Sequence, residues 1–175
     1  MKKFFCLTGI CICCLFSCTD TTKPATDTTA APEQSQAEKN KAVNRAIMKA
    51  IEAGDSAAID TLIAADAIDH SGPKGTEVKG DSLKNMLSHM HSSVTDLKMD
   101  VKEDAADGDY VFTLSTMTGT TKTADMGMPA NTKMDMTSVD VVKFKDGKAV
   151  EHWSYMDPKD MMKMMPPAGK MDKKK

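Results

Sequence analysis

The sequence predicts an α+β domain in which three N-terminal helices cover one face of a curved antiparallel sheet, so that the covered sheet forms a cone. Apolar residues recur at helical spacing between about residues 38 and 93, and from residue 97 onward they alternate with polar residues, as in half-buried strands. An Asp146–Gly147 pair lies between two of these alternating segments. It predicts a hairpin, because both residues of a two-residue turn must tolerate positive φ.

The helical part divides into three segments. The first helix is expected over about 38–53 and should end at Gly54. Asp55 is expected to cap a second, short helix, which leads to a brief extended segment at 67–70. Asp81 is expected to cap a third helix, whose apolar stripe consists of Leu83, Met86, Leu87 and Met90.

The strands follow in order along the chain. Alternation around 97–101 predicts one strand, Gly108–Asp109 marks a turn, and the β-rich segment 110–121 predicts a second strand. A loop then leads to Lys133 and to the strand that enters the hairpin at 138–157.

The hairpin predicts its own register. With Asp146 and Gly147 as the loop residues, Lys145 faces Lys148 and Asp140 faces Trp153. One face would then carry three carboxylates among large apolar side chains, a composition that suits a pocket wall better than a plain core. Its members would be Met136, Ser138, Asp140, Val142, Phe144, Ala149, Glu151, Trp153, Tyr155 and Asp157, whereas His152 would point to the opposite face.

The N-terminus predicts a targeting segment. All five cysteines lie in the first 18 residues, behind Lys2 and Lys3 and within an apolar run that is too short to span a bilayer. The residues before Cys18 resemble the lipobox of bacterial lipoproteins, so Cys18 would become the lipid-modified first residue of the mature chain. An ordinary secretory signal peptide is the alternative.

Four regions follow from this interpretation. Residues 1–17 would be a lipoprotein signal peptide, 18–36 the lipidated cysteine and a flexible tether, 37–160 the folded domain, and 161–175 a tail rich in Met and Lys. The domain would be held at the cell envelope by a lipid anchor in a bacterial membrane, in the periplasm or at the cell surface.

Charge restricts the partners. The chain has 23 basic and 25 acidic side chains, and loss of Lys2 and Lys3 with the signal peptide would leave a formal charge of −4. This balance argues against nucleic acid as a partner. Arg45 is the one arginine in the sequence, so bidentate clamps for phosphates or carboxylates are nearly absent.

Three motifs carry a family resemblance over about residues 40–160. The segments IEAGDSAAIDTLIAADAIDH, MGMPAN and VDVVKFKDGKAVEHWSYMD are similar to those of SnoaL-like polyketide cyclases, in the nuclear transport factor 2-like superfamily. The resemblance implies a conical barrel whose mouth holds a small apolar ligand, and homodimerisation through the exposed sheet face. Ile47, Met48, Ile68 and Lys143 depart from residues that are frequent in relatives, so the pocket lining is not that of a characterised cyclase.

Asp140 and His70 are the candidate catalytic residues. Cyclases of this kind use an aspartate to move a proton, and the resemblance matches Asp140 to it. Burial beside apolar residues is expected to raise the pKa of Asp140. His70, in the family's Asp-His pair, would orient a ligand carbonyl or pair with Asp140 or Asp157. The structural alternatives are an aspartate bonded to Trp153 or a backbone amide, and a histidine that fixes a helix-to-strand corner.

Four residues are candidates for ligand binding. Trp153 and Tyr155 would form an aromatic wall, with Met136 and Asp157 beside them, although core packing explains Trp153 equally well. Asp157 precedes Pro158, so it also suits the N-cap of a terminal helix.

Three functions remain open. The first is a pocket protein that binds a small apolar ligand, with aspartate-mediated proton transfer on a carbonyl compound as in a cyclase or isomerase. The second is a non-catalytic ligand-binding or dimerisation module. The third is a copper(I)-binding lipoprotein, because 16 of 175 residues are Met and a Met-rich run begins at Met161, although these side chains could instead dock a terminal helix. No cofactor is expected, and His89 and His91 do not share a helix face for a metal.

Overall fold

The computed structural model describes residues 35–72, 75–124 and 128–164. The expected signal peptide, Cys18, most of the tether and the tail beyond Met164 lie outside these ranges. None of the helices in the described ranges is long and apolar enough to cross a membrane.

Three helices form the first half of the domain: α1 (Gln36–Ala53), α2 (Ser56–Leu62) and α3 (Gly80–Ser93). Gly54 ends α1 with φ +66°, a conformation that glycine adopts without steric cost. The Asp55 side chain accepts a hydrogen bond from the Ala58 amide at 3.0 Å and caps α2, as predicted. The prediction for Asp81 was wrong, because α3 begins at Gly80 and Asp81 lies within its first turn.

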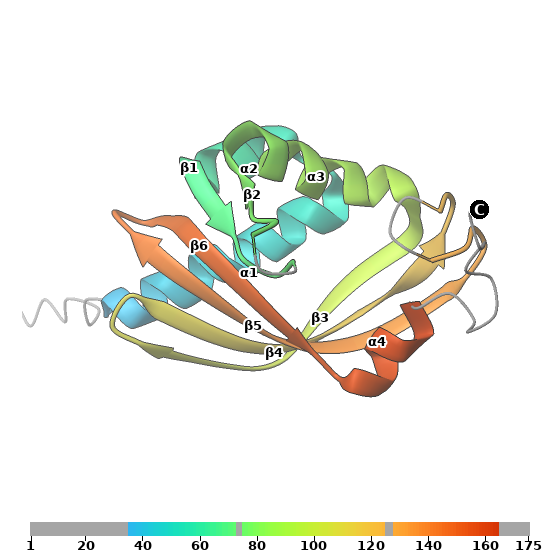
Figure 1. The fold of residues 1–175 in the computed structure, drawn as a ribbon. Helices are drawn as coiled ribbons and strands as arrows, with labels where there is room; N and C mark the ends of the chain where they lie inside the picture. Colours follow the sequence, from blue (N-terminus) through green and yellow to red (C-terminus); the bar gives the residue numbers. More distant parts are fainter. Residues whose placement is uncertain (1–34, 73–74, 125–127, 165–175) are drawn as a thin grey trace, which may run out of the picture. The chain divides into compact units, whose positions relative to one another are not determined.

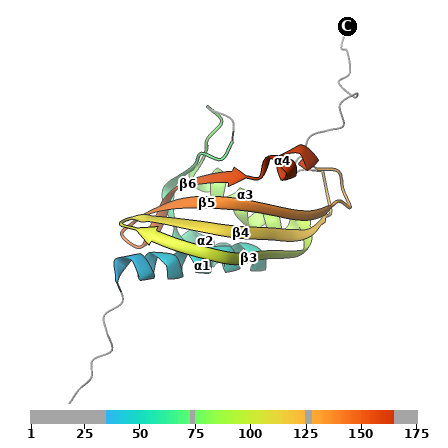
Figure 2. The same cartoon turned by 90° about the horizontal axis from the view of Figure 1, so that it is seen from below.

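Six strands make one sheet: β1 (Ile63–Asp69), β2 (Val78–Lys79), β3 (Val94–Asp107), β4 (Tyr110–Thr121), β5 (Lys133–Lys145) and β6 (Lys148–Met156). Their order is β2-β1-β6-β5-β4-β3, and every pair is antiparallel except β1 with β6. The sheet curves around α1, α2 and α3, which cover one of its faces (Figure 1). Seen from below, β3 to β6 lie in front of these helices, so the opposite face is left open (Figure 2). The predicted α+β class is confirmed.

The register of the β5–β6 hairpin differs from the prediction. Lys145 faces Lys148 and Phe144 faces Ala149, as expected for an Asp146–Gly147 turn. The register then shifts by one residue, so that Lys143 faces Glu151 and Val150 has no opposite residue. This is a β-bulge, and because side chains alternate between faces it exchanges the two faces of β6 beyond it.

The exchange overturns the predicted pair of Asp140 with Trp153. Asp140 faces Ser154, and Trp153 faces Val141. The inner face beneath the helices therefore receives His152, Ser154 and Met156 from β6, whereas the outer face receives Glu151, Trp153 and Tyr155.

A fourth helix, α4 (Pro158–Met164), follows β6 (Figure 1). Asp157 accepts the Lys159 amide at 2.8 Å through its side chain, which confirms the predicted capping role. The buried Asp160 carboxylate accepts the Thr137 amide at 3.0 Å and joins α4 to β5. Met161 is 53% exposed, so its side chain is not the one that docks α4; the other methionines of the docking interpretation, Met164 and Met165, have side chains outside the described part of the structure. The rest of that run, and with it the predicted copper(I) segment, lies largely outside the described residues.

Candidate functional site

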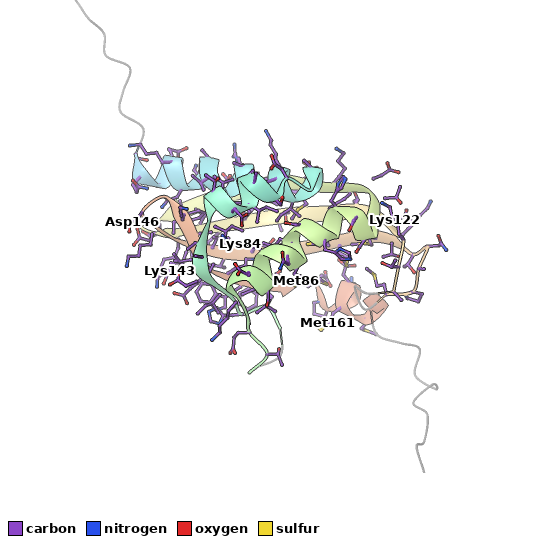
Figure 3. The ribbon with its side chains drawn as sticks, turned by 90° about the horizontal axis from the view of Figure 1, so that it is seen from above. Lys84, Met86, Lys122, Lys143, Asp146 and Met161 are labelled. Atoms are coloured by element: carbon purple, nitrogen blue, oxygen red, sulfur yellow. The ribbon has the colours of Figure 1, made fainter. Side chains whose placement is uncertain are left out.

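A cavity of about 260 Å³ lies between the helices and the inner face of the sheet. Its walls come from α1, α3 and the inner sides of β1, β3, β4, β5 and β6. No Phe, Tyr or Trp is among the described residues that line it. Seven methionines do, namely Met48, Met86, Met90, Met99, Met117, Met136 and Met156. Met86, labelled on α3 in Figure 3, lines the cavity and is 41% exposed.

Polar side chains gather on one wall of this otherwise apolar cavity. The imidazole of His152 lies between two carboxylates: its Nδ1 is 3.3 Å from Asp69 Oδ1, and its Nε2 is 3.4 Å from Asp140 Oδ1. Asp69 comes from the end of β1, Asp140 from the middle of β5 and His152 from β6. We call these three residues the acid–histidine–acid cluster.

Asp140 is saturated with hydrogen bonds. Its Oδ2 accepts the hydroxyls of Ser138 at 2.8 Å and Ser115 at 3.2 Å, and it also accepts from Ser154 and His152. Burial acts to raise the pKa of Asp140, but the bonds from His152 and the serines outweigh it and hold the pKa below its ordinary value. The expected rise of this pKa was wrong, because the predicted register placed Trp153 opposite the carboxylate, where the structure has Ser154 with His152 beside it.

The two carboxylates keep His152 charged. Burial acts to lower the pKa of His152, but its bonds to Asp140 and Asp69 raise it to about 9. The pKa of Asp69 falls to about 2, because the bonds from His152 and from Ser71 outweigh its burial; the Ser71 amide donates to Asp69 Oδ1 at 2.7 Å. At neutral pH the cluster therefore holds an imidazolium and two carboxylates.

His70 and Trp153 lie on the outer face, away from this cluster. Their rings stack, with centroids 4.9 Å apart and planes inclined by 11°. His70 Nε2 is 3.2 Å from Glu151 Oε2, and Lys143 Nζ is 2.9 Å from Glu151 Oε1. His70 thus has Glu151 as its partner, whereas the sequence predicted Asp140 or Asp157.

The structure brings together only some of the predicted site residues. Asp140 and Met136 line the cavity. His70, Trp153 and Tyr155 do not line it, and Tyr155 is 63% exposed on the outer face. Asp157 caps α4, and Cys18 lies outside the described residues.

Two members of the cluster were missed. His152 was assigned to the other face because the bulge at Val150 leaves no clear sequence signal. Asp69 did have a sequence signal. Ile63, Ala67 and Asp69 are separated by even numbers of residues, which places them on the same face of β1, and they are the buried residues of that strand. A carboxylate in phase with buried apolar residues indicates a buried, partnered acid.

The cluster does not have the form of a metal site. No group of three or more His, Cys, Asp and Glu side chains in the described ranges is arranged to hold a metal ion. Its carboxylates instead hold a proton on His152, which suits hydrogen bonding and proton transfer.

Comparisons with known proteins support one family. The sequence profile of the SnoaL-like polyketide cyclases matches residues 41–165. A search among proteins of curated function finds no match to this sequence.

Solved structures share the fold. IdmH from Streptomyces antibioticus, a proposed polyketide cyclase, is 25% identical with a TM-score of 0.60, over 71% of this chain and 96% of its own. AclR from Streptomyces galilaeus, a proposed hydroxylase, is 25% identical with a TM-score of 0.59, and the match covers 71% of this chain and 92% of AclR. An epoxide hydrolase of M. tuberculosis, similar to LEH, is 17% identical with a TM-score of 0.61, over 75% and 92%, and shows the fold alone.

The profile match covers well over half of the sequence, and the curved sheet with its three covering helices agrees with it. The chain therefore belongs to the SnoaL-like polyketide cyclase family.

Proposed function

We propose that this domain binds a small, largely apolar molecule in the cavity beneath α1 and α3, with one polar group of the ligand at the acid–histidine–acid cluster. The observation that carries this proposal is the cavity itself: it is lined mainly by aliphatic and methionine side chains, and its polar groups converge on one wall. Its volume of about 260 Å³ exceeds that of apolar cavities of about 150 Å³ that take benzene.

The methionines of the lining should allow the cavity to accept ligands of different shapes. A thioether side chain is unbranched and polarisable, so it adapts to an irregular partner at small cost. Seven such residues around one cavity suit a site that repacks around its ligand. A rigid aromatic slot, as the sequence suggested from Trp153 and Tyr155, is not how this cavity is built.

Proton transfer is a second candidate, and the position of Asp140 favours it. An ionised carboxylate at the wall of an apolar cavity can accept a proton from a carbon acid. Asp140 would act as the base in this scheme, because its lowered pKa keeps the carboxylate ionised at neutral pH; the same lowering makes it a weak base.

A titration with 2-phenylethanol tests the binding proposal. The protein would be the full mature chain with Cys18→Ser, which prevents acylation, and heat of binding would be measured by calorimetry. We expect saturable binding, and we expect Met90→Trp to weaken it at least tenfold by filling the cavity. Met162→Trp on exposed α4 is the matched control and should bind like the parent protein.

Absence of binding by 2-phenylethanol and by analogues of the same shape with a charged polar end, with the fold intact by circular dichroism, would reject the proposal. The same samples incubated with phenylacetone in D₂O distinguish catalysis from binding alone. Loss of the α-proton signals faster than in buffer, abolished by Asp140→Asn, would support proton transfer, and unchanged signals would reject it.

A further inference from the structure

The polar wall of the cavity directs its hydrogen-bond donors at its own carboxylates. The hydroxyls of Ser115, Ser138 and Ser154 all donate to Asp140. Both ring nitrogens of His152 face carboxylates, Nδ1 toward Asp69 and Nε2 toward Asp140. A hydroxyl that has donated its proton, and a carboxylate, present only lone pairs to a ligand.

The wall therefore offers acceptors at its centre. Asn44, elsewhere in the lining, directs its amide nitrogen at the Thr113 hydroxyl at 2.9 Å. Ser71, whose hydroxyl oxygen is 3.3 Å from His152 Nδ1, is an exposed residue at the edge of the site. A ligand carbonyl or carboxylate placed against Asp140 would meet lone pairs, whereas a donor group would meet partners.

The net charge of the cavity lining also favours a ligand group that donates hydrogen bonds. The described lining contains no Lys or Arg, and its ionisable residues are Asp69, Asp140, Glu151 and His152. The carboxylate of Glu151 belongs to the outer face, where Lys143 and His70 hold it. The imidazolium of His152 balances one of the two remaining carboxylates, so one negative charge is left at the wall of a low-dielectric cavity, where charge acts strongly.

From these two observations we infer that the ligand's polar group is an ammonium, so that the cavity selects small lipophilic amines over alcohols and carboxylic acids of the same shape. A primary ammonium supplies three hydrogen-bond donors and one positive charge, and these complement the acceptors and the negative charge of the wall. This inference rests on the proposed ligand-binding function and specifies its ligand class.

A matched series of probes tests the inference. The probes are 2-phenylethylamine, 2-phenylethanol and phenylacetate, which differ in the charge and donors of one end. At pH 7 we expect the amine to bind about tenfold more tightly than the alcohol, because a charge-assisted hydrogen bond exceeds a neutral one by about 1.4 kcal/mol. Phenylacetate should bind more weakly than the alcohol, since its carboxylate would face Asp140.

Two variants locate the preference. Asp140→Asn should remove the advantage of the amine over the alcohol. Asp69→Asn should reduce the same advantage, and it serves as the test if Asp140→Asn does not fold. Glu151→Gln is the control: it removes a carboxylate from a residue of the lining, but one that Lys143 and His70 already hold. The preference for the amine should survive it.

Each result has a separate meaning. Alcohol binding that equals or exceeds amine binding would overturn the inference and leave the ligand-binding function standing. An amine preference that Asp140→Asn and Asp69→Asn both leave unchanged would also overturn it. Failure of all three probes to bind would reject the proposed function itself.

Discussion

At the scale of single residues, the site depends on His152. Its imidazole joins carboxylates from two strands that are far apart in the sequence, Asp69 on β1 and Asp140 on β5. Mutual hydrogen bonds raise the pKa of the histidine and lower the pKa of both acids. Every buried side-chain nitrogen or oxygen in the described ranges has a hydrogen-bond partner, so the cluster carries no unmet polar group.

The raised pKa of His152 predicts a pH dependence of stability. Because this pKa rises from 6.5 to about 9 on folding, the protonated form contributes stability that is fully present below pH 6.5 and is lost between pH 6.5 and 9. We expect the free energy of unfolding in urea to fall by about 2 kcal/mol over that range, somewhat less than the shift alone implies because the side chain is 32% exposed.

His152→Gln should abolish this slope. His70→Gln is the matched control, because His70 lies on the outer face against a different carboxylate and should leave the slope in place. An equal slope in the parent protein and in His152→Gln would contradict the assignment of the charge to His152.

At the scale of secondary-structure elements, the β-bulge at Val150 decides which side chains of β6 face the helices. Without it, Trp153 would point into the cavity and His152 outward. The outer face of β4, β5 and β6 carries exposed apolar side chains in adjacent rows, and the bulge adds those of β6 to it. These are Phe112 at 42%, Leu114 at 37%, Val139 at 40% and Tyr155 at 63% exposure, with Val141 and Trp153 between them.

An apolar sheet face of this kind predicts self-association. Contiguous exposed apolar surface is typical of protein interfaces, and α1, α2 and α3 lie on the other side of the sheet from this face (Figure 2). We expect the Cys18→Ser mature chain to have the mass of a dimer by light scattering, and the double variant Phe112→Lys with Val139→Lys to be a folded monomer. Met162→Lys, which changes an exposed methionine on α4, should remain a dimer. A monomeric parent protein would reject this interface.

At the scale of the whole molecule, the sequence predicts a lipid-modified cysteine ahead of the folded domain. Cys18 precedes α1 by 17 residues that are rich in Thr, Ala and Pro, a composition that suits a tether. We expect the protein expressed with its native N-terminus to partition into the detergent phase of Triton X-114. Cys18→Ser should move it to the aqueous phase. Aqueous partition of the parent protein would argue for an ordinary secretory signal instead.

Local patterns predicted the elements well, because each depends on neighbouring residues. The period of the apolar residues changes where the helices give way to strands. Gly54 ends α1, and Asp55 and Asp157 cap α2 and α4, as their local sequences predicted. The strand 110–121 was predicted with its exact bounds. The α+β class followed from the same short-range features, whereas the family was identified from the resemblance of three longer segments to those of SnoaL-like polyketide cyclases.

The site depended on tertiary structure, because its geometry comes from contacts between strands. Asp140 was found from the sequence, but its neighbours on β6 were not: one unpaired residue, Val150, placed His152 and Ser154 beside it and moved Trp153 to the outer face. The parallel pairing of β1 with β6 then brought Asp69 opposite His152. Hydrophobic period determines which segments are strands, whereas register and strand order determine which side chains meet, and a shift of one residue changes every one of those partners.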